Sequence, residues 1–225
     1  MQSFHARRAM LRTAGATLSA LLVGPSISAA EQGDWRVRTG PIGVFPSDES
    51  DAVFGGKVGV SDAYGLGLTV GYQITERFGI EFLGASPISH DLEGEGGLAG
   101  LGDVGEVKQL SPTLTVQYYP ELATDWVAPY VGIGASYTTF YEEDSASSLS
   151  GALGDPDAAI RVDDSASIAF QVGADWPVSE QIAINSALWY VDLDTQADIT
   201  ANGATTTVDV AIEPWVAMIG ATYHF

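Results

Sequence analysis

The sequence predicts an all-β chain that folds as an eight-stranded antiparallel transmembrane β-barrel. Three observations predict this class. The C-terminal stretch alternates apolar residues with small or polar ones, seven further stretches of similar character are joined by alternately long and short connections, and the N-terminal segment is typical of exported proteins. Tilted strands of about 10 residues with one apolar face are what a membrane barrel needs.

The C-terminal stretch, residues 208–225, has the clearest alternation. Its two faces, counted back from the terminus in steps of two, are Phe225, Tyr223, Ala221, Ile219, Ala217 and Trp215 against His224, Thr222, Gly220, Met218 and Val216. The first face suits lipid and the second a lumen. A final strand that ends on Phe225 resembles those of bacterial outer-membrane barrels, in which it is the address read by the barrel-assembly machinery. We therefore expect that machinery and outer-membrane lipids as partners.

The first 30 residues predict a signal peptide. Arg7, Arg8 and Arg12 form a basic start, residues Met10–Val23 are mainly small and apolar, and Ser28–Ala30 offers a small-residue cleavage site. An N-terminal anchor is the alternative, but the apolar core is short for a spanning helix. The pair Arg7–Arg8 resembles a twin-arginine signal, so the export route stays open between the general secretory and twin-arginine systems. Residues 31–225 form the predicted barrel domain.

Composition limits the functions that this chain can have. All 29 acidic residues lie beyond the signal peptide, but only six of the nine basic ones do, so the formal charge of the remaining chain is 6 minus 29, or −23. Such a surface excludes nucleic acid as a partner. The chain has no Cys, which excludes disulfides and thiol chemistry. No later segment approaches 18 uninterrupted apolar residues, so membrane insertion has to rest on strands.

Eight strands are predicted in order. They are Asp34–Phe45, Tyr64–Ile74, Phe78–Leu83, Val107–Tyr119, Val127–Tyr137, Ala166–Trp176, Ile182–Thr195 and Val208–Phe225. In the second strand, large apolar residues alternate with Gly, Thr and Gln. A soluble sandwich would place the bulky residues inside, whereas a membrane barrel can turn them to lipid and the glycines inward.

The connections alternate in length as they do in outer-membrane barrels. Long loops are expected at 46–62, 91–103, 142–163 and 198–206, and short turns at 75–77, 120–125 and 177–180. Long connections are external and short ones periplasmic in such barrels, and an even strand number leaves no open edge. Two interfacial girdles of aromatic residues are expected near the strand ends: Trp35, Tyr64, Tyr72, Phe78, Tyr118, Trp126, Tyr141, Trp176, Trp215 and Tyr223.

Five sequence segments, which follow one another in the same order over the predicted barrel domain, resemble the OmpW family. They are 79–87 with His90–Asp91, 111–114 with 117–119, 129–134 with 137–140, 189–195, and 213–216 with 223–225. The resemblance implies a bacterial outer-membrane barrel with a narrow, largely apolar interior, associated with passage of small hydrophobic molecules and their release sideways through the wall. The third external loop departs from the family in being especially polar and acidic, so the solute stays open.

Trp189 is the candidate gate. If strand seven turns Asn185, Ala187, Trp189, Val191 and Leu193 inward, the indole reaches the lumen where the family keeps an apolar constriction. Leu83, Met218 and Val216 are its candidate channel-lining neighbours. The alternatives are that Trp189 faces lipid or only fills the interior, because a register change of one residue reverses the two faces of a strand.

Pro87 and Pro112 are candidates for a lateral opening. They fall at the expected external ends of the neighbouring strands three and four, and Pro214 has the same place on strand eight. Proline cannot donate to the ladder, so two of them side by side could loosen the wall. The alternative is that the prolines only begin or end strands at bulges.

Inward charges predict a second internal feature. Arg36, Arg38, Glu81 and Asp175 fall on or near the inner faces of their strands, and burying them requires pairing. We expect a small polar network that fills the periplasmic half of the barrel.

Catalytic and metal sites have little support. His90 with Asp91, and Asp192 with Asp194, could form an acid–base set at the external rim, but rim carboxylates usually face solvent. Acidic clusters such as residues 142–144 lack the ligand spacing of a known calcium loop. We expect no enzyme, no cofactor and no metal.

Two functions stay open. The first is passive passage of small hydrophobic molecules. The alternative is a structural or adhesive barrel with a closed lumen, whose acidic external loops bind a partner. A continuous apolar cavity in the upper lumen favours passage, and polar side chains throughout favour the structural role. The sequence leaves the oligomeric state open.

Overall fold

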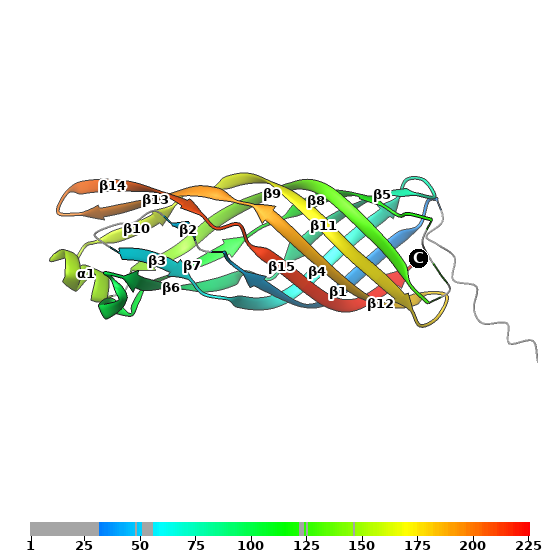
Figure 1. Cartoon of the computed structure of the whole chain (residues 1–225), viewed down its shortest axis with the longest axis horizontal. Helices are drawn as coiled ribbons and strands as arrows, with labels where there is room; N and C mark the ends of the chain where they lie inside the picture. The colour runs from blue at the N-terminus through cyan, green and yellow to red at the C-terminus, as the bar shows by residue number, and fades with distance from the viewer. Residues whose placement is uncertain (1–31, 48, 51–55, 122–123, 125, 146) are drawn as a thin grey trace, which may run out of the picture.

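The computed structural model describes residues 32–47, 49–50, 56–121, 124, 126–145 and 147–225. The predicted signal peptide lies outside these residues. The described chain is a long, slender barrel with the C-terminus at one end and the external connections at the other (Figure 1). Its strand segments are β1 (Trp35–Phe45), β2 (Glu49–Ser50), β3 (Gly56–Val60), β4 (Ala63–Gln73), β5 (Phe78–Ala85), β6 (Ile88–Gly96), β7 (Asp103–Leu110), β8 (Thr113–Tyr118), β9 (Ala128–Ser145), β10 (Ala159–Val162), β11 (Ser165–Pro177), β12 (Ile182–Asp192), β13 (Asp194–Ala201), β14 (Ala204–Ala211) and β15 (Trp215–His224).

Eight segments close the barrel. Their order around the wall is β1, β4, β5, β8, β9, β11, β12 and β15, and β15 pairs back with β1. All neighbours are antiparallel. Closure brings β1 and β15 together at Gly40, where an added Cβ would lie 2.1 Å from the Ile219 carbonyl oxygen. The predicted eight-stranded antiparallel barrel is confirmed.

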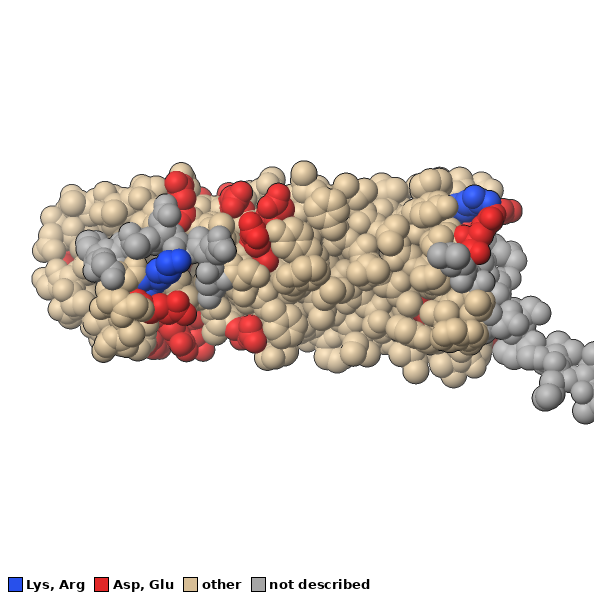
Figure 2. Space-filling view, in the orientation of Figure 1, with Lys and Arg blue, Asp and Glu red and all other residues tan. Residues whose placement is uncertain are grey.

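The two faces of each strand are sorted as the alternation predicts. On β4, Leu66 and Leu68 are exposed, whereas Gly67 and Thr69 are buried. On β15, Ile219 is 63% exposed and Met218 1%. On the face drawn in Figure 2, acidic and basic side chains lie over part of the outer half and at the opposite end, and a broad band of other residues lies between them. Large apolar side chains such as Leu66, Ile133 and Ile219 are exposed on the wall, which suits the hydrocarbon layer of a membrane.

The external connections differ from the prediction, which treated them as loops. The barrel continues outward as the paired strands β6–β7 and β13–β14, and β9 runs on to Ser145. Inward residues there remain apolar, as with Ile199 and Val208. The loop prediction was wrong because acidic and Gly-rich strands have weak sequence signals. The turn Asn202–Gly203 has φ of 52° and 74°, as a tight two-residue hairpin turn requires.

Two short helices complete the outer end. They are η1 (Ala99–Leu101) and α1 (Ser147–Leu153), and α1 buries Leu149. Among the described residues, no helix has the length and apolar character that would let it cross a membrane.

Candidate functional site: an apolar lumen above a polar plug

Buried charges fill the periplasmic half of the lumen. Arg38 donates to Glu81 and, from Nη2, to Asp175 Oδ2 at 2.6 Å. All three side chains are almost completely buried. The Arg36 guanidinium lies 4.5 Å from the centre of the Tyr119 ring and donates to Gln73. Arg38 is therefore paired with both carboxylates, as the sequence predicted. Arg36 lies in the same interior but forms no ion pair among the described residues, and its contacts are with Gln73 and the Tyr119 ring.

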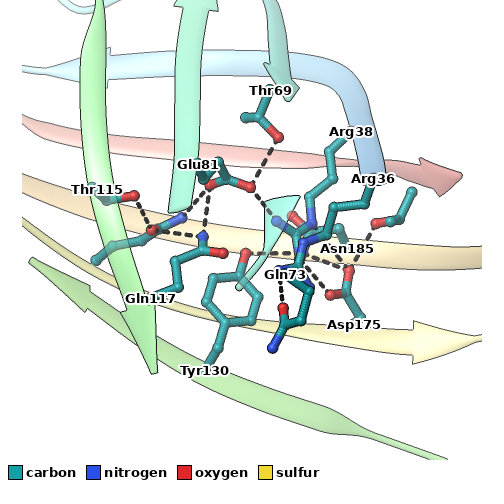
Figure 3. A network of polar contacts seen from close by, with 12 residues as sticks. Arg36, Arg38, Thr69, Gln73, Glu81, Thr115, Gln117, Tyr130, Asp175 and Asn185 are labelled. Atoms are coloured by element: carbon teal, nitrogen blue, oxygen red, sulfur yellow. Dashed lines mark hydrogen bonds and ion pairs between the residues drawn. The ribbon is translucent and has the colours of Figure 1, made fainter. Parts of the chain in front are cut away.

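Amides and hydroxyls complete this network (Figure 3). Gln117 and Gln171 each donate to Glu81 Oε1 at 2.8 Å, and Thr69 donates to Glu81 Oε2 at 3.0 Å. Asn185 donates to Asp175 at 2.9 Å. We call the set the polar plug: Arg36, Arg38, Gln73, Glu81, Gln117, Gln171, Asp175 and Asn185. Because Arg38 is paired with both carboxylates and these accept further hydrogen bonds, a hydrophobic solute would have to disrupt these contacts to pass straight through.

The outer half of the lumen is apolar and holds cavities. The outer cavity, of about 70 Å³, is lined mainly by Val, Leu, Ile and Phe side chains of β3, β6, β7, β9, β10, β13 and β14, with His90 and Gln109 among them. A further cavity of about 260 Å³ lies beneath α1 and shares Val58, Ile160 and Ile199 with it. The upper lumen is thus apolar over most of its length.

A lower cavity of about 40 Å³ lies between the outer cavity and the polar plug. It shares Val44 and Gln109 with the outer cavity. Trp189 lines it and is 1% exposed, so the indole projects inward as predicted and not toward lipid. Leu83 and Val216 line the same cavity, and Met218 packs in the same cluster without lining it.

The Trp189 indole carries an unusual feature for a buried side chain. Its Nε1–H has no hydrogen-bond acceptor among the described residues. An unpaired buried donor costs about 1–3 kcal/mol. The indole therefore fills the lumen at this height at a cost in stability. An apolar side chain such as Leu would fill space there without leaving a donor unpaired.

The wall is interrupted beside the lower cavity. The β5–β8 ladder ends at Leu83 with Thr113, and pairing between the same two walls resumes only at Ile88 with Gln109. We call residues 84–87 and 110–112 the wall break. On each side of the wall break, the chain keeps a hydrogen bond to the next strand around the barrel. Ser86 N–H donates to Leu66 O of β4 at 2.9 Å, and Tyr137 N–H of β9 donates to Pro112 O at 3.0 Å. Each wall therefore keeps its hydrogen bonds to the strand behind it, whereas among the described residues no strand pairing joins the two walls across the wall break.

Pro87 and Pro112 both lie in the wall break, as the sequence suggested. Each falls in the short gap between two strand segments, Pro87 between β5 and β6 and Pro112 between β7 and β8. Pro214 similarly separates β14 from β15. This placement is compatible with an opening and with the alternative in which prolines only end strands.

The residues considered for rim catalysis do not form a set. His90 is 1% exposed inside the lumen, where its Nδ1–H donates to the Ser61 carbonyl at 2.7 Å. Asp91, Asp192 and Asp194 face solvent. Within the described part of the chain, no group of three or more His, Asp or Glu could hold a metal ion. Asp155, in the acidic external connection, accepts the Asn202 N–H, and this hydrogen bond lowers the pKa of its carboxyl.

A closed eight-stranded wall, an apolar outer band and a plugged periplasmic end define an integral outer-membrane β-barrel. The sequence model of the OmpW family matches residues 31–225. Outer membrane protein W of Vibrio cholerae serotype O1 is 39% identical over 214 residues, which are 93% of this chain and 96% of that protein. The chain therefore belongs to the OmpW family, whose members are non-enzymatic barrels of the bacterial outer membrane.

Solved structures agree with the fold. The crystal structure of the outer membrane protein OprG from Pseudomonas aeruginosa superposes with a TM-score of 0.79 at 36% identity, and covers 88% of this chain and 99% of that one. A more distant relative, 28% identical over 173 residues (73% of this chain and 72% of that protein), is the dibenzothiophene metabolism operon protein PahQ of Pseudomonas aeruginosa.

Sequence reasoning missed the amides of the polar plug and Gln109. Gln73, Gln117 and Gln171 are buried inside the barrel, where the sequence had predicted only the four charged residues. The available signal was their position: each lies on the face opposite the lipid-facing side chains, where a buried carboxamide requires a partner.

Proposed function

We propose that this barrel provides passive passage for small hydrophobic molecules into the outer membrane, with lateral exit through the wall break. One observation carries the proposal. The lower cavity is lined from both sides of the wall break, by Ala85 and Ser86 on one side and Leu110 and Ser111 on the other, and it lies directly above the polar plug. A solute in the lower cavity could leave sideways through the wall break, whereas the polar plug blocks the route along the barrel axis.

Energetics favour that route. Passing straight through means separating buried charges, and an uncompensated buried charge costs about 3–5 kcal/mol. Leaving sideways transfers the solute into hydrocarbon, where each ~100 Å² of apolar surface kept from water is worth about 2.5 kcal/mol. The lateral path therefore ends in a favourable state without disrupting the polar plug.

The alternative, a structural or adhesive barrel with a closed lumen, would favour polar side chains along the whole interior. The apolar cavities of the outer half support passage instead. The name of the relative PahQ, which refers to metabolism of dibenzothiophene, supports a hydrophobic solute for this group of barrels.

Trp189 is the proposed gate of the lower cavity, with Leu83, Val216 and Met218 packed around it. Trp189→Ala should enlarge the lower cavity and raise the uptake rate by roughly three- to tenfold, equivalent to about 1 kcal/mol in the barrier. Uptake of N-phenyl-1-naphthylamine, which brightens in acyl chains, measures this in vesicles with lipopolysaccharide in the outer leaflet. A rate equal to that of protein-free vesicles for both proteins would favour the structural alternative.

A cysteine pair tests the lateral exit. Ala85 and Ser111 would face one another if the β5–β8 register continued, and the native chain has no Cys. Oxidation of Ala85→Cys/Ser111→Cys should close the wall break and lower uptake, and reduction should restore it. The control pair Ile80→Cys/Val116→Cys links the same strands where they are already paired. If both crosslinked pairs behave alike, solutes do not leave through the wall break.

A further inference from the structure

Gln109 lies at the junction of the outer and lower cavities. Its side chain lines both, as does that of Val44, so a solute moving from one cavity to the other passes these two residues. Gln109 is 8% exposed, and it is the inward residue of β7 immediately before the wall break. A single carboxamide therefore stands in an otherwise largely apolar passage.

The Gln109 carboxamide differs from the buried amides of the polar plug. Gln73, Gln117 and Gln171 all make side-chain hydrogen bonds to one another or to charged groups. The backbone of Gln109 pairs with Ile88 and Phe140, but no hydrogen bond reaches its side chain from any described residue. Buried amides are nearly always hydrogen-bonded, so a carboxamide that faces a cavity without a protein partner is suited to a ligand.

A second polar group that lines the lower cavity also lacks a hydrogen-bond partner in the part of the chain that the structure describes. The Nε1–H of Trp189, which lines the lower cavity, is a donor without an acceptor among the described residues. Both the indole N–H and the carboxamide NH₂ can donate to an oxygen of a solute. No charged side chain lines the lower cavity, so an ionised solute would lose its hydration there without gaining a counter-ion.

Resting on the passage proposed above, we propose that this lumen selects small neutral molecules that carry one oxygen acceptor on a hydrocarbon body, such as ketones, esters or alcohols, and that Gln109 binds this oxygen as the solute crosses between the cavities. Gln109 then sets specificity by favouring oxygenated solutes over pure hydrocarbons. A neutral hydrogen bond of this kind is worth roughly a three- to tenfold preference.

The test compares three ligands of similar length, 2-octanone, n-nonane and octanoate, on the whole barrel in lipid nanodiscs at pH 7. The Gln109 side-chain amide protons and the Val44 methyl groups are followed by NMR. We expect 2-octanone and n-nonane both to shift the Val44 methyls, only 2-octanone to shift the Gln109 amide protons downfield, and octanoate to shift neither. Gln109→Met keeps the length of the side chain and should remove the ketone preference. Gln196→Leu, an exposed residue on β13, should retain it.

The outcomes separate the two proposals. If no ligand shifts the Val44 methyls, the passage itself is wrong. If ketone and hydrocarbon bind with equal affinity to the wild-type barrel, or if the ketone preference survives in Gln109→Met, the passage stands and the assignment to Gln109 is overturned. Binding of octanoate as tight as that of 2-octanone would overturn the restriction to neutral solutes. The wild-type amide shift decides the question even if Gln109→Met fails to fold.

Discussion

The two halves of the lumen are built by the same strands and filled in opposite ways. On β1 the inward residues Arg36 and Arg38 are followed, after Gly40, by Ile42 and Val44. On β5 the change from Glu81 to Leu83 takes a single step. Periodicity alone therefore fixes which residues face inward, and the identity of those residues decides whether a given height of the barrel is sealed or hollow.

This difference shows how a narrow barrel can be filled at one end and still hold cavities at the other. An eight-stranded barrel has room only for side chains or one small ligand. In the periplasmic half, long polar side chains reach across and bond to one another, which leaves the interior filled. In the outer half, Val, Leu and Ile side chains cannot bond across the lumen and leave cavities. The wall break lies at the height where the filling changes, which is where a lateral exit is useful.

The largest expected effect comes from breaking the charge balance of the polar half. Arg38→Met leaves Glu81 and Asp175 buried without their cation and should lower the free energy of unfolding by about 3–5 kcal/mol. Urea unfolding in phospholipid vesicles measures this loss. Arg77→Met is the matched control, because the Arg77–Glu121 pair is exposed and should contribute at most about 1 kcal/mol.

A neutral version of the polar plug separates charge from packing. Adding Glu81→Gln and Asp175→Asn to Arg38→Met removes both uncompensated carboxylates, so the triple variant should be more stable than the single one. If Arg38→Met is no less stable than Arg77→Met, the polar half does not depend on its ion pairs.

A smaller effect is expected from making the apolar half polar. Leu92 is buried on β6 and lines the outer cavity. Leu92→Gln should reduce uptake of a hydrophobic tracer by roughly three- to tenfold, because an added amide makes the cavity about 1 kcal/mol less favourable for a hydrocarbon. The neighbouring Asp91 is exposed, so Asp91→Asn controls for changes on the same strand. Equal uptake in both variants would mean that the outer cavity is not on the path.

The sequence predicted the barrel and the charged core of the polar half, for a physical reason. Bulky residues such as Leu66 and Ile219 alternate with small or polar ones because lipid lies on one side and a narrow lumen on the other. Inward charges such as Arg38 and Asp175 have few ways to be buried except by pairing. These inferences need only the face of each residue, which period-two alternation supplies.

The outer half could not be predicted as well. Strands β6 and β13 are acidic or Thr-rich and contain few large apolar residues, so the alternation that marks the other strands is weak in them. The wall break depends on where two ladders stop, and Pro87 and Pro112 indicated its place without showing that residues on both sides line one cavity. The position of Gln109 between two cavities depends on the shapes of those cavities, which no local pattern encodes.

The smallest expected effect concerns polar contacts in water, at the tip of the outer half. Asp155 accepts the Asn202 N–H at 2.6 Å and the Asp157 N–H at 3.0 Å, and both hydrogen bonds lower the pKa of its carboxyl below the ordinary 3.8. Because the folded pKa is the lower one, the contribution to stability is present above the unfolded pKa and is lost as the pH falls through the folded pKa. The Asn202 amide shift should therefore titrate with a midpoint below 3.8, and Asp155→Asn should abolish that titration. Whole-barrel stability should change far less in Asp155→Asn than in Arg38→Met, since water screens the Asp155 carboxylate whereas Arg38 is completely buried. If both variants lost a comparable amount of stability, burial would not be what makes the polar contacts in the lumen stronger than those at the tip.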